Sequence, residues 1–266
     1  MRASLGADLR EMVAEQFDYR ELLYQMTLRD LLLRYKQTVM GFGWAIFMPL
    51  VNTAVFSVIF TRVAPLPTPV PYPVFAFCGL WAWNFFASTL RFSVISLTSN
   101  TNLVSKVYFP REIFPFSTVL VGLVDFLVSA VVLAALMAWY GIVPGLALLW
   151  LPVIIAVHVA FTAGVALIVS MANLFYRDVK YLFEVAITVW MFATSVVYPV
   201  SNIGGRLGSV LSLNPMTPVI DAYRNVILLN VPPSSGFLVA AAISVVVLVG
   251  GWVSFHRAEF SFAENV

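Results

Sequence analysis

The feature that most constrains this chain is a stretch from Ile113 to Tyr176 that contains a single charged residue, Asp125. A helix needs about 20 mostly apolar residues to cross a bilayer, so this stretch is too long for one span and suits two. The whole chain is 61% hydrophobic and 11% charged, whereas a soluble domain carries roughly a quarter charged residues. No water-soluble fold of this size can bury so much apolar surface. The sequence therefore predicts an integral membrane protein.

Other apolar segments, two of which contain one charged residue each (Arg91 and Glu184), bring the expected count to six spanning helices in a single all-α transmembrane domain over residues 1–266. A run of alternating prolines from Pro65 to Pro73 separates the first two spans, because proline cannot continue a helix. The predicted spans are Phe42–Phe60, Val74–Thr98, two helices within Ile113–Tyr176 on either side of a hairpin at Tyr140–Gly145, Phe183–Pro199 and Phe237–Phe255.

The distribution of Lys and Arg orients these spans, because short cytoplasmic segments carry most of the basic residues of membrane proteins. Residues 1–36 are dense in charge and lack the apolar core of a cleavable signal peptide, so we expect the N-terminus in the cytoplasm. An even number of spans then places the C-terminus there too. The predicted inner segments hold Arg2, Arg10, Arg20, Arg29, Arg34, Lys36, Lys106, Arg111, Arg177, Lys180 and Arg257, and the outer segments hold only Arg62, Arg206 and Arg224.

Residues Tyr19–Lys36 have the pattern of an amphipathic helix. Tyr24, Leu28, Leu31 and Tyr35 recur at helical spacing, which indicates one apolar side and a polar side facing the cytoplasm. We expect this helix to lie along the inner membrane surface. The alternative is a surface helix that only anchors the first span.

Two further segments contain more than a connecting loop needs. The inner connection Asn102–Pro115 mixes charges with apolar residues that we expect to be exposed, Val107, Tyr108 and Phe109, and such a surface suits a soluble partner. The alternative is a loop whose aromatic side chains lie among lipid headgroups.

The outer segment Asn202–Pro233 is too apolar for a solvated loop and too interrupted for a span. It predicts two short re-entrant helices, Leu207–Leu213 and Thr217–Leu229, since irregular backbone at membrane depth needs protein or a water-filled cavity around it. Asp221 and Arg224 stand three residues apart, a spacing that favours an ion pair on a helix.

The sequence lacks residues that several activities require. No Gly-x-x-x-x-Gly-Lys-Ser/Thr motif is present, so a separate chain would have to hydrolyse ATP. Cys78 is the single cysteine, and we expect no metal site, no cofactor and no nucleic-acid partner.

Intramembrane ionisable residues often mark coupling-ion sites, but Arg91, Asp125, His158 and Glu184 are few for a secondary transporter. We expect Asp125 to be structural, capping backbone or pairing with Arg91, and His158 to be a core residue. Cytoplasmic acids are too scattered for a membrane enzyme.

Four segments give the chain a nearly full-length resemblance to one family. They are RELLYQMTLRDLLLRYKQTVMGFGWAIFMPL from Arg20, NLVSKVYFPREIFP from Asn102, NLFYRDVKYLFE from Asn173 and LNPMTPVIDAYRNVIL from Leu213. In this order and at these distances from the spans, the chain resembles the membrane-spanning permeases of ATP-binding-cassette polysaccharide exporters. These handle O-antigens, capsules and teichoic acids in the bacterial inner membrane.

The resemblance implies a homodimeric permease that binds two ATPase subunits and exports a lipid-linked glycan. ATP and Mg would bind in the ATPase. Residues 1–36 would contain the interface helix, 99–115 the coupling loop and 200–235 the outer gating segment. The implied coupling residues are Val104, Ser105, Lys106, Val107, Tyr108, Phe109, Arg111 and Glu112, and the implied gate residues are Asn214, Pro215, Asp221 and Arg224.

Two more groups of residues follow from this reading. Cations at the inner surface attract phosphate, so Arg29, Arg34 and Lys36 are candidates to meet the pyrophosphate of the lipid carrier at an entrance. Aromatic rings suit the apolar faces of sugars, and the candidates in the channel are Trp44, Phe47, Phe183, Trp190 and Tyr198. Membrane lipids and the protein core are the alternative neighbours of these rings. The rival functions are export of a small molecule or lipid, and secondary transport.

Overall fold

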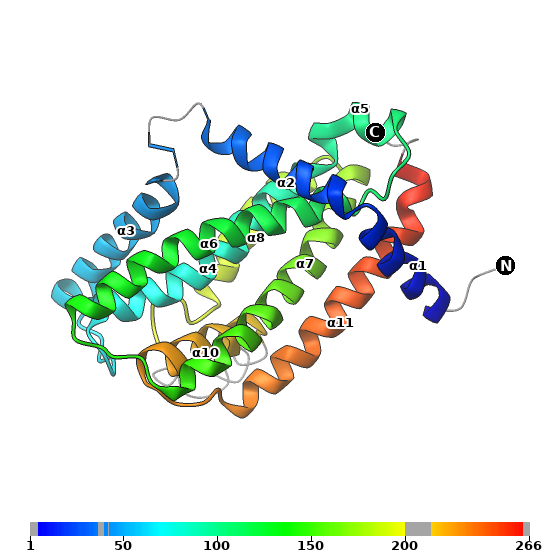
Figure 1. The fold of residues 1–266 in the computed structure, drawn as a ribbon. Helices are drawn as coiled ribbons and strands as arrows, with labels where there is room; N and C mark the ends of the chain where they lie inside the picture. Colours follow the sequence, from blue (N-terminus) through cyan, green and yellow to red (C-terminus); the bar gives the residue numbers. More distant parts are fainter. Residues whose placement is uncertain (1–4, 37–39, 42, 200–213, 263–266) are drawn as a thin grey trace.

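The computed structural model describes residues 5–36, 40–41, 43–199 and 214–262, and every regular element in these ranges is helical. This confirms the all-α class. The α-helices are α1 (Leu5–Asp18), α2 (Arg20–Tyr35), α3 (Gly43–Val58), α4 (Tyr72–Ser96), α5 (Thr101–Lys106), α6 (Ile113–Trp139), α7 (Leu151–Phe175), α8 (Val179–Phe192), α10 (Met216–Leu228) and α11 (Ser235–Ala258) (Figure 1). A π-helical turn, Ile59–Val63, extends α3, and 3₁₀ turns occupy Thr98–Asn100, Leu146–Trp150 and Glu259–Ser261.

Five of the described helical segments are long and apolar enough to cross a membrane. They are Ile46–Val63, Tyr72–Ser96, Ile113–Trp139, Leu146–Phe175 and Ser235–Ser261. They match the first four predicted spans and the last. The hairpin at Tyr140–Gly145 is also present, where Gly141 adopts a φ of +68° that glycine tolerates at no steric cost.

The predicted fifth span, Phe183–Pro199, differs from the structure. Helix α8 ends at Phe192 after 14 residues, which is about 21 Å of helix at 1.5 Å per residue, against a hydrocarbon core of about 30 Å. Ala193–Tyr198 form turns and bends instead of helix. The predicted short helix Leu207–Leu213 lies outside the described residues, whereas α10 corresponds to the other one, Thr217–Leu229.

Helix α4 is the centre of the bundle. It packs against α3, α6, α7, α8 and α10, and most of its residues are buried, as expected for a mainly apolar helix surrounded by protein. Trp81 stacks on Phe126 of α6 with ring centroids 3.9 Å apart, and its indole Nε1 donates to the Phe126 carbonyl at 2.8 Å. His158 of α7 is fully buried and lies 3.3 Å from the Tyr223 hydroxyl, which confirms that it is a core residue.

Helices α1 and α2 lie on the outside of the bundle, near the end that carries α5 (Figure 1); we call this the α5 end, and the opposite one the α10 end. The inner side of α2 packs on α6 and places Met26 in a buried cluster with Phe109, Phe114 and Phe255. Tyr24, Leu28, Leu32 and Leu33 on its other side are exposed. The structure therefore gives α2 two apolar sides, and the predicted row of Tyr24 and Leu28 is the one that protein leaves uncovered. Helix α1 was not predicted.

Helices α7 and α11 meet through glycines, with their backbones in contact. A Cβ added to Gly164 would lie 2.6 Å from the backbone nitrogen of Leu248, and one added to Gly251 would lie 2.6 Å from the Gly164 carbonyl oxygen. Neither position can take a larger residue without moving a helix. Small residues that allow backbones to approach are typical of helix pairs in membranes.

Candidate transport pathway and coupling surface

A cavity of about 470 Å³ lies between α2, α3, α4 and α6. Its lining combines aromatic, polar and charged side chains at the level of apolar spanning helices. Charged or polar residues at such depth usually face a cavity or another protein group. The lining includes Arg34, Trp44, Asn52, Trp81, Asn84, Phe85, Ser88, Arg91, Phe92, Asp125, Phe126 and Ser129. This volume is in the usual range for small-molecule sites, about 300–1,000 Å³.

An ion pair between α2 and α6 forms one wall of the cavity. The Arg34 guanidinium donates to the Asp125 carboxylate, and the Tyr35 hydroxyl donates to the other carboxylate oxygen at 2.5 Å. The Arg34 guanidinium also lies 3.8 Å from the centre of the Phe92 ring. Burial raises the pKa of the Tyr35 phenol most, and the hydrogen bond to the Asp125 carboxylate raises it further. The Tyr35 hydroxyl therefore keeps its proton and remains a hydrogen-bond donor. Asp125 thus holds the end of α2 against α6.

The predicted pairing of Asp125 with Arg91 is wrong. Arg91 instead binds Glu184 of α8, with its Nε 3.0 Å from the carboxylate, and this pair is exposed. The sequence places Arg91 and Asp125 in neighbouring spans, but α8 also packs against α4 and α2 also packs on α6. Each of these helices supplies the nearer partner.

The three cations predicted at the entrance do not form one cluster, and two of them are paired with carboxylates. Arg34 faces the protein and is held by Asp125, and Arg29 binds its neighbour Asp30 at 2.8 Å. Lys36 is exposed at the end of α2. Of the three, Arg29 and Lys36 have side chains that a ligand outside the bundle can reach, whereas the Arg34 side chain is only 16% exposed.

The five predicted channel aromatics fall into two groups. Trp44 and Phe47 of α3 are exposed, and their rings meet edge to face with centroids 5.8 Å apart. Trp44 also lines the cavity. Phe183 is buried in the main apolar core, and Trp190 and Tyr198 pack against that core. Within one chain, the rings of Trp44 and Phe47 are therefore accessible. The rings of Phe183, Trp190 and Tyr198 contribute mainly to the packing of the core.

Arg224 of α10 stabilises the irregular backbone that follows α8. Its guanidinium donates to the carbonyls of Ser195 and Val196, each at 2.6 Å, and it lies 3.7 Å from the centre of the Phe75 ring. The predicted pairing with Asp221 is present at 3.4 Å, but the backbone carbonyls are the closer partners. Non-helical carbonyls inside an apolar bundle need such donors. The predicted gate residue Arg224 is therefore 4% exposed, and both of its terminal nitrogens are hydrogen-bonded within the protein.

Asn214 connects the same irregular segment to the beginning of α10. Its side-chain amide donates to the carbonyl of Ala193 at 3.1 Å and to the Thr194 hydroxyl at 2.7 Å. Its side-chain oxygen accepts from the Trp190 indole at 3.0 Å and from the Met216 amide at 3.1 Å. Pro215 immediately precedes the first turn of α10. The predicted gate residues thus form a connected structure at the α10 end.

The predicted coupling segment presents a short exposed surface at the α5 end. Ser105, Lys106, Val107 and Tyr108 are exposed, and Tyr108 keeps 86% of its surface accessible. Arg111 secures the base of the segment, because its guanidinium donates to the carbonyls of Val104 and Glu259. A large exposed aromatic ring on a firmly held loop is a typical feature of a protein-binding surface.

Three members of the predicted coupling set point inward. The expectation that Phe109 is exposed is wrong, since it is 6% exposed and packs against Phe114 with ring centroids 5.5 Å apart. Val104 is fully buried, and Glu112 is 1% exposed. These side chains turn inward because α6 begins at Ile113 and carries its first turn into the apolar cluster at the α5 end.

The polar lining of the cavity includes residues that the sequence analysis did not single out. Asn52, Asn84 and Ser88 lie within the first two apolar segments. Uncharged polar residues in a spanning helix are a weak signal, because Ser and Asn also bond within their own helix. A ring of amides, hydroxyls and aromatic surfaces can bind both the hydroxyls and the apolar faces of a polar ligand.

The family model for the ABC-2 type transporter matches residues 21–228. The chain belongs to this family. The match runs from α2 to the end of α10 and so includes the cavity, the Arg34–Asp125 pair, the coupling segment and the contacts of Arg224 in this ABC-2 transporter. Helices α1 and α11 lie outside it.

Curated relatives resemble this ABC-2 transporter over most of its length. It is 30% identical over 258 residues to the O-antigen export system permease protein RfbA of Myxococcus xanthus, covering 96% of this chain and 99% of the relative. A protein of the same name from Klebsiella pneumoniae is 30% identical, covering 92% and 94%. The polysialic acid transport protein KpsM of Escherichia coli is 24% identical, covering 76% and 79%.

Proposed function

We propose that this ABC-2 transporter chain is the permease subunit of an ATP-driven exporter that moves a lipid-linked polysaccharide across the bacterial inner membrane. The observation that supports this proposal most strongly is the similarity of nearly the whole chain to two O-antigen export permeases. The relative named as a polysialic acid transport protein supports a polysaccharide cargo beyond O-antigen, and we include capsule and teichoic acid glycans in the proposed class. A cavity that combines aromatic rings with polar side chains supports a sugar-containing cargo.

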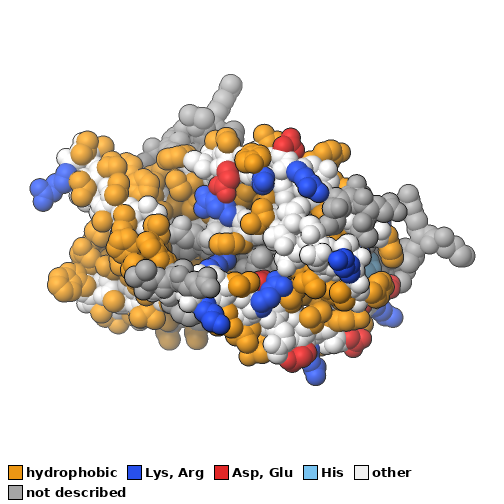
Figure 2. Space-filling model, turned by 90° about the horizontal axis from the view of Figure 1, so that it is seen from above, with side chains coloured by type: hydrophobic (Ala, Val, Ile, Leu, Met, Phe, Trp, Pro, Cys, Tyr) orange, Lys and Arg blue, Asp and Glu red, His pale blue; other side chains and the backbone are white. Residues whose placement is uncertain are grey.

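The proposed topology has six spans with both termini in the cytoplasm. Helix α8 and the irregular segment after it together cross the membrane, and α10 is a re-entrant helix at the outer face. The α5 end is cytoplasmic in this arrangement. Lys and Arg side chains are spread over the face that carries α1, α2 and α5, beside apolar ones (Figure 2), as the excess of basic residues on the inner side requires.

The working exporter would contain two copies of this chain and two ATPase subunits that bind ATP and Mg. Helix α3 and α8 both carry exposed apolar faces, including Met48, Val55, Leu182 and Val189, and a second copy related by two-fold symmetry would cover part of them. ATP binding would close the ATPase pair and push on the coupling segment. The motion would reach α2 through the shared apolar cluster at the α5 end.

Exposed residues of the coupling segment provide a direct test of ATPase docking. Replacing Val107 and Tyr108 together with Asp should abolish co-purification of the ATPase, because two charges would enter an apolar contact. The measurement is the ratio of ATPase to permease after affinity purification from detergent extracts. The matched control is Val143→Asp, an equally exposed apolar site on the hairpin at the α10 end, which should leave the ratio unchanged. Undiminished co-purification of the double variant would remove this surface from the interface.

The accessible cations of α2 are proposed to meet the pyrophosphate of the lipid carrier. Replacing Arg29 and Lys36 with Ala should lower export several-fold, because phosphate would lose two charge-assisted partners. Export is measured as surface polysaccharide per cell, and permease abundance and ATPase binding should stay at the wild-type level. An exposed basic residue of α1, Arg10, provides the control substitution. Export at the wild-type rate in the double variant would exclude this role.

The proposed function as a whole is tested by deleting the gene and examining the glycolipids of the cell. Loss of a surface glycan, with accumulation of its lipid-linked form inside, is the expected result, and re-expression of the chain should reverse it. The accumulated lipid would identify the glycan and its carrier. An unchanged surface and an unchanged internal pool, in a strain without a second copy, would favour export of a small molecule or a different lipid.

A further inference from the structure

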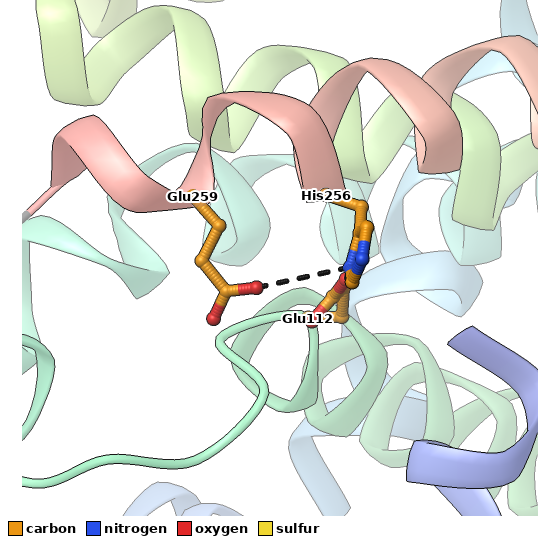
Figure 3. Close-up of side chains that lie close together, drawn as sticks. All are labelled: Glu112, His256 and Glu259. Atoms are coloured by element: carbon orange, nitrogen blue, oxygen red, sulfur yellow. Dashed lines mark hydrogen bonds and ion pairs between the residues drawn. The ribbon is translucent and has the colours of Figure 1, made fainter. Parts of the chain in front are cut away.

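Three titratable side chains from separate elements converge at the α5 end of the chain. Glu112 immediately precedes α6, His256 lies in the last turn of α11, and Glu259 begins the 3₁₀ turn that follows (Figure 3). The His256 Nδ1 is 3.1 Å from a Glu112 oxygen and 3.9 Å from a Glu259 oxygen. One possible ligand atom from each residue lies within 4.8 Å of the others.

The two carboxylates each have an oxygen left for a further partner. Glu112 is 1% exposed, and its Oε2 is buried without a hydrogen-bond partner, while Oε1 faces His256. The Arg111 backbone amide donates to Glu259 Oε1 at 2.8 Å, and Glu259 Oε2 is the atom near His256. A buried carboxylate oxygen without a partner is costly, so the orphan on Glu112 points to a missing cation or donor.

Negative charge is in excess around this cluster. Glu15 of α1 is close enough to interact with Glu112 and His256; burial raises the pKa of its carboxyl, the Glu112 carboxylate adds to that rise, and His256 opposes it. Glu15, Glu112 and Glu259 thus bring three carboxylates into the surroundings of the His256 imidazole, and the Arg111 guanidinium lies beside them, with its Nη1 3.8 Å from Glu259 Oε1. A cation bound between Glu112 and Glu259 would balance them.

We propose that Glu112, His256 and Glu259 form a binding site for a divalent transition-metal ion, with one imidazole nitrogen and two carboxylate oxygens as ligands. Zn²⁺ accepts this donor set, at about 2.0–2.2 Å from each ligand atom, so that two ligands in tetrahedral geometry lie about 3.4 Å apart. The separations of 3.1 and 3.9 Å bracket this value. The ion would take the place of the hydrogen bond between His256 and Glu112 Oε1, and it would bring a cation next to the carboxylate whose other oxygen, Oε2, has no partner.

A backbone hydrogen bond already fixes one of the proposed ligands. The Arg111 amide orients Glu259, and hydrogen bonds from outside a metal site normally fix its ligands in this way. The ion would join the base of the coupling segment to the end of α11, two elements that are far apart in the chain. This site goes beyond the proposed transport function, and it departs from the sequence-based expectation that the chain holds no metal.

The test is Zn²⁺ binding by the full-length chain purified in detergent. The protein is treated with chelator, dialysed and titrated with Zn²⁺, and bound metal is counted by elemental analysis after gel filtration. We expect one tightly bound ion per chain. Glu259→Gln and His256→Ala should each weaken binding at least about tenfold, because even the loss of an outer-shell partner costs about 10–100-fold. Glu11→Gln, an exposed carboxylate on α1, should leave binding unchanged.

Direct spectroscopy of the wild-type chain keeps the test decisive if a variant fails to fold. Co²⁺ bound in place of Zn²⁺ should give visible absorption bands typical of nitrogen and oxygen ligands in a four- or five-coordinate site. Absence of a stoichiometric ion in the wild-type chain would overturn the proposal. So would equal Zn²⁺ affinity in the wild-type and Glu259→Gln proteins. In either case these three residues do not form a metal site. These readouts do not depend on export, so they remain valid if the transport substrate is a different one.

Discussion

Replacing Arg224 with Ala is expected to destabilise the protein by about 2–6 kcal/mol, since two buried carbonyl groups would each lose a partner at about 1–3 kcal/mol. The carbonyls are those of Ser195 and Val196, and no helix satisfies them. The loss should appear as a large fall in the midpoint of thermal unfolding in detergent. We also expect α10 to become accessible to proteases, because its attachment to the segment after α8 would be lost.

Arg224→Lys distinguishes the shape of this side chain from its charge. Lysine keeps the positive charge but lacks the planar fork that reaches two oxygens at once, so most of the destabilisation should remain. Arg62, an exposed arginine in the π-helical turn after α3, serves as the control, and Arg62→Ala should shift the midpoint little. A fully stable Lys variant would mean that charge alone supports the segment. A stable Ala variant would contradict the structural role of Arg224.

Replacing Asp125 with Ala should cost about 3–5 kcal/mol, because the largely buried Arg34 guanidinium would lose its counter-charge. Both side chains of the pair are only 16% exposed. The exposed pair of Arg91 and Glu184 is the matched control, and Arg91→Ala should cost no more than about 1 kcal/mol. Unfolding of the purified chain measured by intrinsic tryptophan fluorescence reports both.

A double-mutant cycle isolates the interaction between Arg34 and Asp125. Replacing Arg34 with Met and Asp125 with Leu together should restore much of the stability lost in either single variant, since an apolar pair often substitutes for a buried ion pair. Additive losses in the double variant would show that the two residues do not act as a pair. If stability returns while export stays low, the pair also serves the transport cycle.

Most spanning helices could be predicted because each one is a long apolar run with at most one charged residue. Helices α4, α6, α7 and α11 follow directly from such runs and from the turn at Gly141. The same rule overestimated the length of the fifth helix, because Ala193–Tyr198 carries no charge yet forms turns and bends whose carbonyls at Ser195 and Val196 accept from Arg224. Helix α1 was missed although Leu5, Leu9 and Met12 recur at helical spacing in this charge-rich segment, and Met12 is buried.

The partners of the site residues could not be predicted from spacing along the chain. Asp125 and Arg34 are 91 residues apart, and only the packing of α2 on α6 brings them together. Phe109 follows exposed residues and precedes Pro110, yet the beginning of α6 turns it inward. The Glu112–His256–Glu259 cluster offered one weak signal, because His256 and Glu259 stand three residues apart and thus share a helix face.

The glycine contact between α7 and α11 has a consequence for how the chain can change shape. Lipid tails are as apolar as leucine, so these helices are held by close packing, which depends steeply on distance. Separating Gly164 from Gly251 would lose that packing along the whole pair. Helix α3, by contrast, touches the bundle on one side and adjoins the 470 Å³ cavity. During a transport cycle we therefore expect α7 and α11 to stay together and α3 to be the helix that moves.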